Sequence, residues 1–194
     1  AAWEIRDLLW KDKDNRGSVL ASLRFMDSER AWDLRRHSDK KSTIWGLLEG
    51  LAGIDSDEAW RIREKNEGDY LPWVVLSLTG IDDRRAWDIR LRLEAQATKL
   101  VIKSLTGLET DEAWDMRDRQ GLWDKETVTS IKGSDHPRAW NLRERLMDYW
   151  PGYVAKSVGI TLAKEPRGRA FMEQLALRFG DNPDVAHYLV KLEN

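Results

Sequence analysis

The sequence predicts an all-α fold: a right-handed α-solenoid of about six two-helix repeats of roughly 27 residues, closed by a C-terminal helical cap. Three observations predict it. A short signature recurs at near-constant spacing, its residues are spaced for one amphipathic helix, and a second apolar segment follows each copy. We expect one repeat domain over residues 1–194, with repeats at about 1–27, 28–55, 56–82, 83–109, 110–135 and 136–165 and a cap at 166–194.

The signature is Ala-Trp-x-aliphatic-Arg, as in "DSDEAWRIREK" from Asp55. Residues three apart share one face of a helix, so the alanine and the aliphatic face the core while tryptophan and arginine form the adjoining face. The tryptophans recur at spacings of 29, 28, 27, 27 and 26 residues: Trp3, Trp32, Trp60, Trp87, Trp114 and Trp140. The arginines are Arg6, Arg35, Arg63, Arg90, Arg117 and Arg143.

The first helix of each repeat has a recognisable start. Ser28, Ser56, Asp83 and Thr110 stand ahead of four signatures, and their side-chain oxygens are suited to accept the free amides of a first turn. In the next repeat His136 takes this place and is followed by Pro137, a residue favoured at the first helical position. We therefore expect first helices of roughly ten residues.

The second helix of each repeat is predicted by the pattern aliphatic-x-x-small-aliphatic, as in "WVVLSLTG". Such a β-branched run could also form a strand, but the spacing of Val74, Ser77 and Leu78 and the glycine that follows favour a helix. The small residues are Ser22, Gly50, Ser77, Ser104, Ser130 and Ser157. The predicted left-handed helix ends are Gly53, Gly80, Gly107 and Gly133.

Both ends of the chain depart from this pattern. Phe171 stands in a degenerate seventh signature, after which Gly180 ends one helix, and Asn182 with Pro183 starts another, as expected of a cap. The chain begins inside a signature and without Met, which predicts that further repeats or another domain precede it.

The tryptophans could offer stacking platforms to a ligand, but an aromatic residue at the same place on every amphipathic helix is typical of a core. We expect the six signature tryptophans to pack between repeats. The remaining five are candidates for exposed contacts or for anchoring loops: Trp10, Trp45, Trp73, Trp123 and Trp150.

The signature arginines could follow a phosphate backbone, but acidic residues accompany them. An acid directly follows four signature tryptophans: Glu4, Asp33, Asp88 and Asp115. The whole chain has a formal charge of −2, from 32 basic and 34 acidic residues, whereas a nucleic-acid surface needs uncompensated positive charge. We therefore expect each arginine to stack on a tryptophan or to bind the loop acids of a neighbouring repeat.

No catalytic residue, cofactor or metal site is predicted. The chain has no cysteine, which excludes disulfides and thiolate ligands and favours a cytoplasmic location. Its histidines His37, His136 and His187 fall in unrelated repeats. The segment from Asp12 imitates a calcium loop, but Leu23 stands where the bidentate glutamate belongs. No apolar run is long enough to cross a membrane, and no signal peptide opens the chain.

The whole chain resembles the short HEAT-like α-helical repeats, which implies an α-solenoid with an extended binding surface. The segment "DSERAWDLR" at Asp27 is also similar to repeats appended to bacterial thymidylate-kinase-like proteins. That second resemblance implies a non-catalytic appendage, because no nucleotide-binding motif lies in the chain.

These observations favour a non-catalytic protein-interaction or scaffolding module, whose partner is another protein or another domain of the same polypeptide. A nucleic-acid-binding solenoid and a regulatory appendage of a larger enzyme remain as alternatives, and the N-terminal repeat could support an end-to-end dimer. Recognition is expected at helix positions that vary between repeats: Arg36, His37, Glu64, Lys65, Leu91, Arg92, Asp118, Arg119, Glu144 and Arg145.

Overall fold

The computed structural model describes residues 2–38, 41–119 and 125–193. These residues form fourteen α-helices and two short 3₁₀ helices, and they contain no strand, which confirms the all-α prediction. The chain divides into two compact bodies, Ala1–Ser104 and Leu105–Asn194, and each is considered by itself. Trp123 lies outside the described residues.

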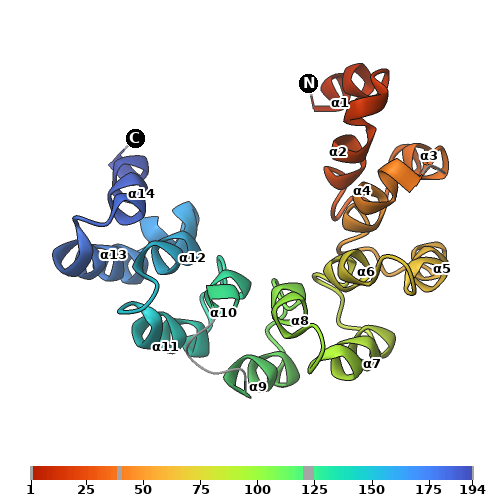
Figure 1. Ribbon diagram of the computed structural model, residues 1–194. Helices are drawn as coiled ribbons and strands as arrows, with labels where there is room; N and C mark the ends of the chain where they lie inside the picture. The colour runs from red at the N-terminus through yellow and green to blue at the C-terminus, as the bar shows by residue number, and fades with distance from the viewer. Residues whose placement is uncertain (1, 39–40, 120–124, 194) are drawn as a thin grey trace. The chain divides into compact units, whose positions relative to one another are not determined.

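The N-terminal body alternates two kinds of helix (Figure 1). The first helices carry the signatures: α1 (Ala2–Trp10), α3 (Glu29–Arg36), α5 (Asp57–Asn66) and α7 (Arg84–Leu93). The second helices are α2 (Arg16–Ala21), α4 (Ile44–Glu49), α6 (Leu71–Ser77) and α8 (Thr98–Ser104), with 3₁₀ helices at Lys13–Asn15 and Lys41–Thr43. Each second helix packs on the next one along the chain, and the first helices α3, α5 and α7 lie on one side of that row.

The C-terminal body contains α9 (Asp111–Arg119), α10 (Lys125–Ser130), α11 (Pro137–Leu146), α12 (Pro151–Lys164), α13 (Pro166–Phe179) and α14 (Pro183–Glu193). Helix α12 is central to this body, because it packs against α10, α11, α13 and α14. It is kinked at Gly159, where φ is +71°. The core joins the signature residues Trp114 and Trp140 to Phe171 of the degenerate copy.

Most of the predicted helix starts are confirmed. Ser28 and Ser56 accept the amides of Ala31 and Ala59, while Asp83 and His136 accept those of Arg85 and Arg138. In the cap, the Asn182 side chain accepts the amides of Asp184 and Val185. The prediction for Thr110 is wrong: its Oγ1 atom is buried and has no hydrogen-bond partner among the described residues.

The predicted left-handed helix ends are confirmed as well. Gly53, Gly80, Gly107 and Gly133 have φ between +74° and +84°. At the corresponding position of the first repeat, Phe25 adopts φ +60° although it is not glycine. The amide of this left-handed residue donates to the next repeat, from Phe25 to Ala52 O, from Gly53 to Thr79 O and from Gly133 to Ser157 O, each at 2.8 Å. Backbone hydrogen bonds thus connect successive second helices.

The predicted core face is completely buried at the alanines of the interior repeats and is exposed in the first repeat. The signature alanines from Ala31 to Ala139 are completely buried, and Trp32, Trp60, Trp114 and Trp140 are at most 6 % exposed. Trp3 and Trp87 are only half-buried. Ile5, in the aliphatic position of the first signature, is 59 % exposed.

Candidate interaction surface

Five signature arginines are buried and stacked on tryptophan. Each is at most 2 % exposed, and its Cζ atom lies 4.5–4.8 Å from the ring centroid of the tryptophan of the same repeat: Arg35, Arg63, Arg90, Arg117 and Arg143. This geometry confirms the stacking that the sequence predicts, since a cation over an indole face is a favourable contact.

The hydrogen bonds of these arginines differ from the contact with loop acids that the sequence also predicted. The Arg90 guanidinium donates to carbonyl oxygens of Leu78 (2.7 Å) and Ile81 (3.0 Å), just past the end of α6. It also donates to Ser104 at the end of α8, at 3.1 Å to Oγ and 3.3 Å to the carbonyl oxygen. The acceptors are therefore helix C-termini, whose free carbonyls carry partial negative charge, and not loop acids.

The same contacts recur along the chain. The carbonyl acceptors lie 12 and 9 residues before the arginine, and the serine lies 13 or 14 residues after it. Arg63 binds Leu51 O, Ile54 O and Ser77. In the C-terminal body, Arg117 binds Leu105 O, Leu108 O and Ser130, and Arg143 binds Ile131 O, Ser134 O and Ser157. Within each body, a guanidinium such as that of Arg63 or Arg143 thus joins the ends of two successive second helices.

Burial lowers the pKa of four of these arginines to about 10: Arg35, Arg63, Arg117 and Arg143. Desolvation is the main cause, since a charge taken out of water is disfavoured. A pKa of about 10 still leaves each guanidinium protonated at neutral pH. These cations therefore keep their charge while they bind the helix ends.

The loop acids bind the tryptophans instead. The indole Nε1 atom donates to an aspartate five residues earlier, at 2.6 Å for Trp32 and Asp27, 2.5 Å for Trp60 and Asp55, and 2.7 Å for both Trp87 with Asp82 and Trp140 with Asp135. The constant five-residue spacing is visible in the sequence and could have revealed this contact.

The fifth repeat lacks that indole contact. It has Glu109 in place of the aspartate, and the buried Nε1 atom of Trp114 has no hydrogen-bond partner among the described residues. Its ring stacks instead on His136, with 4.8 Å between the centroids.

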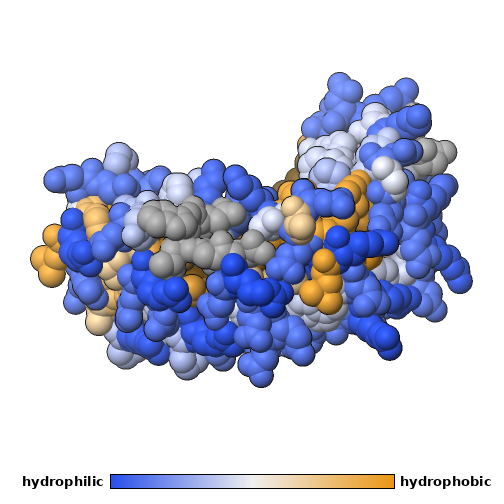
Figure 2. Space-filling view, turned by 60° about the horizontal axis from the view of Figure 1, so that its bottom comes forward, coloured by the Kyte–Doolittle hydropathy of each residue, from blue (hydrophilic) through white to orange (hydrophobic). Residues whose placement is uncertain are grey.

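The ten residues expected to carry recognition are all exposed. Within the N-terminal body, the first helices and the turn after α3 present Arg36 and His37, Glu64 and Lys65, and Leu91 and Arg92. Within the C-terminal body, α9 and α11 present Asp118 and Arg119, and Glu144 and Arg145. Figure 2 shows hydrophilic residues over most of the face that it draws, with hydrophobic residues in separate patches.

Several of these side chains also link neighbouring first helices. The Arg36 Nε atom lies 3.1 Å from Glu58 Oε1, and Arg138 Nη2 lies 2.5 Å from Asp118 Oδ2. Arg92 pairs with Glu67. Exposed pairs of this kind contribute little to stability, so these side chains can exchange partners at small cost.

Four of the tryptophans outside the signature are half-buried: Trp10, Trp45, Trp73 and Trp150. The rings of Trp45 and Trp73 are 5.9 Å apart between centroids, and Arg16 lies over Trp10 at 5.2 Å. Trp150 packs edge-on against Tyr153 at 6.0 Å. These rings contact neighbouring side chains and also keep part of their surface open.

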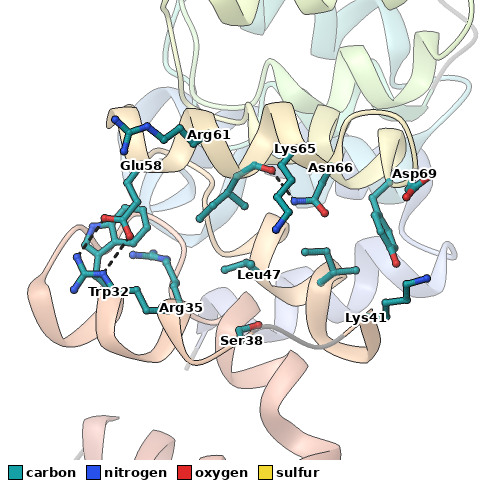
Figure 3. Close-up of a pocket in the computed structure, with 14 residues that line it drawn as sticks. Trp32, Arg35, Ser38, Lys41, Leu47, Glu58, Arg61, Lys65, Asn66 and Asp69 are labelled. Atoms are coloured by element: carbon teal, nitrogen blue, oxygen red, sulfur yellow. Dashed lines mark hydrogen bonds and ion pairs between the residues drawn. The ribbon is translucent and has the colours of Figure 1, made fainter.

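A cavity of about 590 Å³ lies between α3, α4 and α5, and we call it the α3–α5 cavity. Its apolar lining includes Trp32, Ile44, Leu47, Ile62 and Tyr70. Figure 3 shows Lys65 reaching from α5 into this space. Of the residues expected to carry recognition, Arg36 and Lys65 line it.

The described residues hold no group of three His, Asp or Glu side chains that could bind a metal ion. His37 lies 2.6 Å from Asp33 O, His136 caps α11, and His187 contacts Tyr188. Among the described helices, none has the length and apolar character needed to cross a membrane.

Comparison of the chain with protein-family models, with curated proteins and with solved structures gave no match.

Proposed function

We propose that this chain is a non-catalytic protein-interaction or scaffolding module, built as a right-handed α-solenoid of about six two-helix repeats with a C-terminal cap and acting in the cytoplasm. Its partner is another protein or another domain of the same polypeptide. Repeat arrays commonly bind partners through the extended surface that their stacked units present.

The observation that carries this proposal is that the recurring residues are buried, whereas the residues that vary between repeats are exposed. The residues that recur are used inside the fold, because the signature arginines bind helix ends and the signature tryptophans pack over them. The residues that change between repeats, such as Glu64, Leu91 and Glu144, are exposed. A surface whose composition changes from repeat to repeat can select one partner from many.

The buried arginines weaken the nucleic-acid alternative. A phosphate-tracking ladder needs guanidinium groups on the surface, whereas Arg63, Arg90 and Arg143 have no exposed surface. The exposed arginines Arg36 and Arg85 and the half-buried Arg138 each lie within ion-pair distance of carboxylates.

Site-specific photo-crosslinking tests the proposal. A photoreactive amino acid would replace Leu91 or Glu144 on the first helices, or the exposed control residues Ser18 and Lys132, in the full-length protein in its own cells. We expect Leu91 and Glu144 to cross-link to a defined polypeptide, or to another domain of the same chain, and the controls not to. Equal labelling at all four sites, or none, would contradict the proposal. Salt-sensitive retention on a nucleic-acid column would favour the alternative.

A further inference from the structure

The α3–α5 cavity lies beside an exception in the arginine ties. In four repeats the arginine Nε atom donates to a serine hydroxyl oxygen, that of Ser77, Ser104, Ser130 or Ser157. Gly50 stands at this position beside Arg35. Helices α2 and α4 approach so closely that a Cβ atom on Gly50 would lie 2.1 Å from Leu20 O. The close packing therefore requires glycine and deprives Arg35 of a partner.

Arg35 is accordingly a buried cation with incomplete pairing. It is 2 % exposed, and its Nη2 atom donates to Leu23 O and Gly50 O, both at 2.9 Å. Its Nε and Nη1 atoms have no hydrogen-bond partner among the described residues. The charges of Asp27 and Glu58 act on Arg35 through space, but their hydrogen bonds are accepted from Trp32 and Arg36. A buried donor without a partner costs free energy, which an incoming negative charge can offset.

A second cation approaches the cavity from the opposite wall. Figure 3 shows the Lys65 side chain extending from α5 toward Leu47. Arg61, one turn earlier on α5, lines the cavity as well. Within the described part of the chain, Lys65 forms no ion pair. Lysine and arginine thus place two positive charges at a space lined by Ile44, Leu47 and Ile62.

We propose that the α3–α5 cavity binds an acidic side chain, Asp or Glu, of a partner protein, together with an aliphatic or aromatic side chain next to it. The Lys65 ammonium donates to the carboxylate, and the buried Arg35 charge attracts it from the wall. The neighbouring apolar side chain of the partner packs on Ile44, Leu47 and Ile62. A cavity of about 590 Å³ is of the size that small ligands and a pair of side chains fill.

The other charged residues of the lining also bear on the occupant. Glu58 and Asp69 line the cavity together with the basic residues Arg36, Lys41 and Arg61. The lining is therefore net positive, which favours an anion, and a single carboxylate would be held between Lys65 and Arg35. This inference rests on the proposed protein-interaction function and specifies one contact of it.

A peptide-display selection tests the inference with the intact chain. A library of random peptides would be panned on the wild-type protein, and enriched peptides would be measured by fluorescence anisotropy against the wild type, Lys65→Gln and the matched control Lys99→Gln. Lys65 on α5 and Lys99 on α8 are both exposed, and only Lys65 lines the cavity. Thermal unfolding of each variant would verify that the fold is retained. The free carboxylate 3-phenylpropionate would be titrated in parallel.

We expect enriched peptides to place Asp or Glu beside Leu, Ile, Phe or Trp. Their Kd should weaken about tenfold or more in Lys65→Gln and by no more than about twofold in Lys99→Gln. Equal effects of the two variants, enriched peptides without an acid, or no enriched peptide would overturn the inference. So would 3-phenylpropionate binding as tightly as the peptides, because the site would then be one for a small molecule. Cross-links at Leu91 or Glu144 alongside any of these outcomes would leave the proposed function standing.

Discussion

The Nη2 atom of Arg90 lies 2.7 Å from the carbonyl oxygen of Leu78, at the end of the second helix of the preceding repeat. The same guanidinium reaches Ser104 at the end of the second helix of its own repeat. The signature arginine thus links successive repeats through backbone carbonyls and one serine hydroxyl.

The serine that completes this tie should contribute measurably to stability. Ser104→Ala removes the acceptor of Arg90 Nε and leaves a buried donor unpaired, so we expect a loss of about 1–3 kcal/mol in the free energy of unfolding by urea. Ser22→Ala is the matched control in the same body, because Arg6 and Ser22 meet at a more exposed position. A loss at Ser22 as large as that at Ser104 would show that burial does not determine the strength of the tie.

The left-handed helix end of the second repeat, Gly53, should be more sensitive to substitution than the others, because Phe25 of the first repeat lies against it. Gly53→Ala puts a Cβ atom on a backbone with φ +74°, 2.1 Å from the Phe25 ring, whereas a Cβ on Gly107 would meet nothing within 4 Å. We expect Gly107→Ala to cost about 1–2 kcal/mol for the left-handed backbone alone, and Gly53→Ala to cost more. In a Phe25→Gly background the excess cost at Gly53 should disappear. Additive effects of Phe25→Gly and Gly53→Ala would argue against this contact.

The loss in the free energy of unfolding on replacing a signature tryptophan by alanine should increase with the burial of that tryptophan. Trp60→Ala and Trp114→Ala should each cost about 3–5 kcal/mol, as expected for a fully buried large side chain. Trp3→Ala and Trp87→Ala should each cost clearly less, because both side chains are only half-buried. Equal losses in chemical denaturation at Trp3, Trp87 and Trp114 would count against the repeat architecture.

The fifth repeat offers a stabilising substitution. Glu109→Asp restores the residue that binds the indole in the other repeats, so the buried Nε1 atom of Trp114 gains an acceptor. We expect a gain of about 0.5–1.5 kcal/mol in the free energy of unfolding. Glu112→Asp, an exposed acid of the same repeat, serves as the control and should change stability little. An unchanged or lowered stability for Glu109→Asp would show that the stack of Trp114 on His136 stabilises the fifth repeat as well as an indole hydrogen bond would.

Much of the fold could be predicted because its determinants are local and repeated. Ser56 and Gly53 act on the backbone around them, and the three-residue spacing of Ala59 and Ile62 fixes a helix face. The first repeat shows the limit: Ile5 has the pattern of a core residue, but burial requires a neighbour that the pattern does not describe.

The arginine contacts were only half predictable. Stacking of Arg63 on Trp60 follows from their spacing on one helix, but the carbonyl acceptors such as Leu51 O have no side-chain signature in the sequence. The α3–α5 cavity was not predictable either, because it depends on the packing of α3, α4 and α5 and on which way Lys65 points. Gly50 was visible as a small residue, yet its effect on Arg35 appears only once the neighbouring Leu20 carbonyl is placed.

The most direct test of the central claim is the free energy of unfolding of Arg90→Met beside that of Arg6→Met. Arg90 is buried and joins the ends of two second helices, whereas Arg6 is half-buried and binds Ser22. Methionine keeps the unbranched apolar part of the side chain but removes the guanidinium donor from the carbonyls of Leu78, Ile81 and Ser104. We predict a loss of about 3–5 kcal/mol for Arg90→Met and a loss of less than about 1 kcal/mol for Arg6→Met. Near-equal or negligible losses in the two variants would contradict the claim that the signature arginines fasten the repeats together.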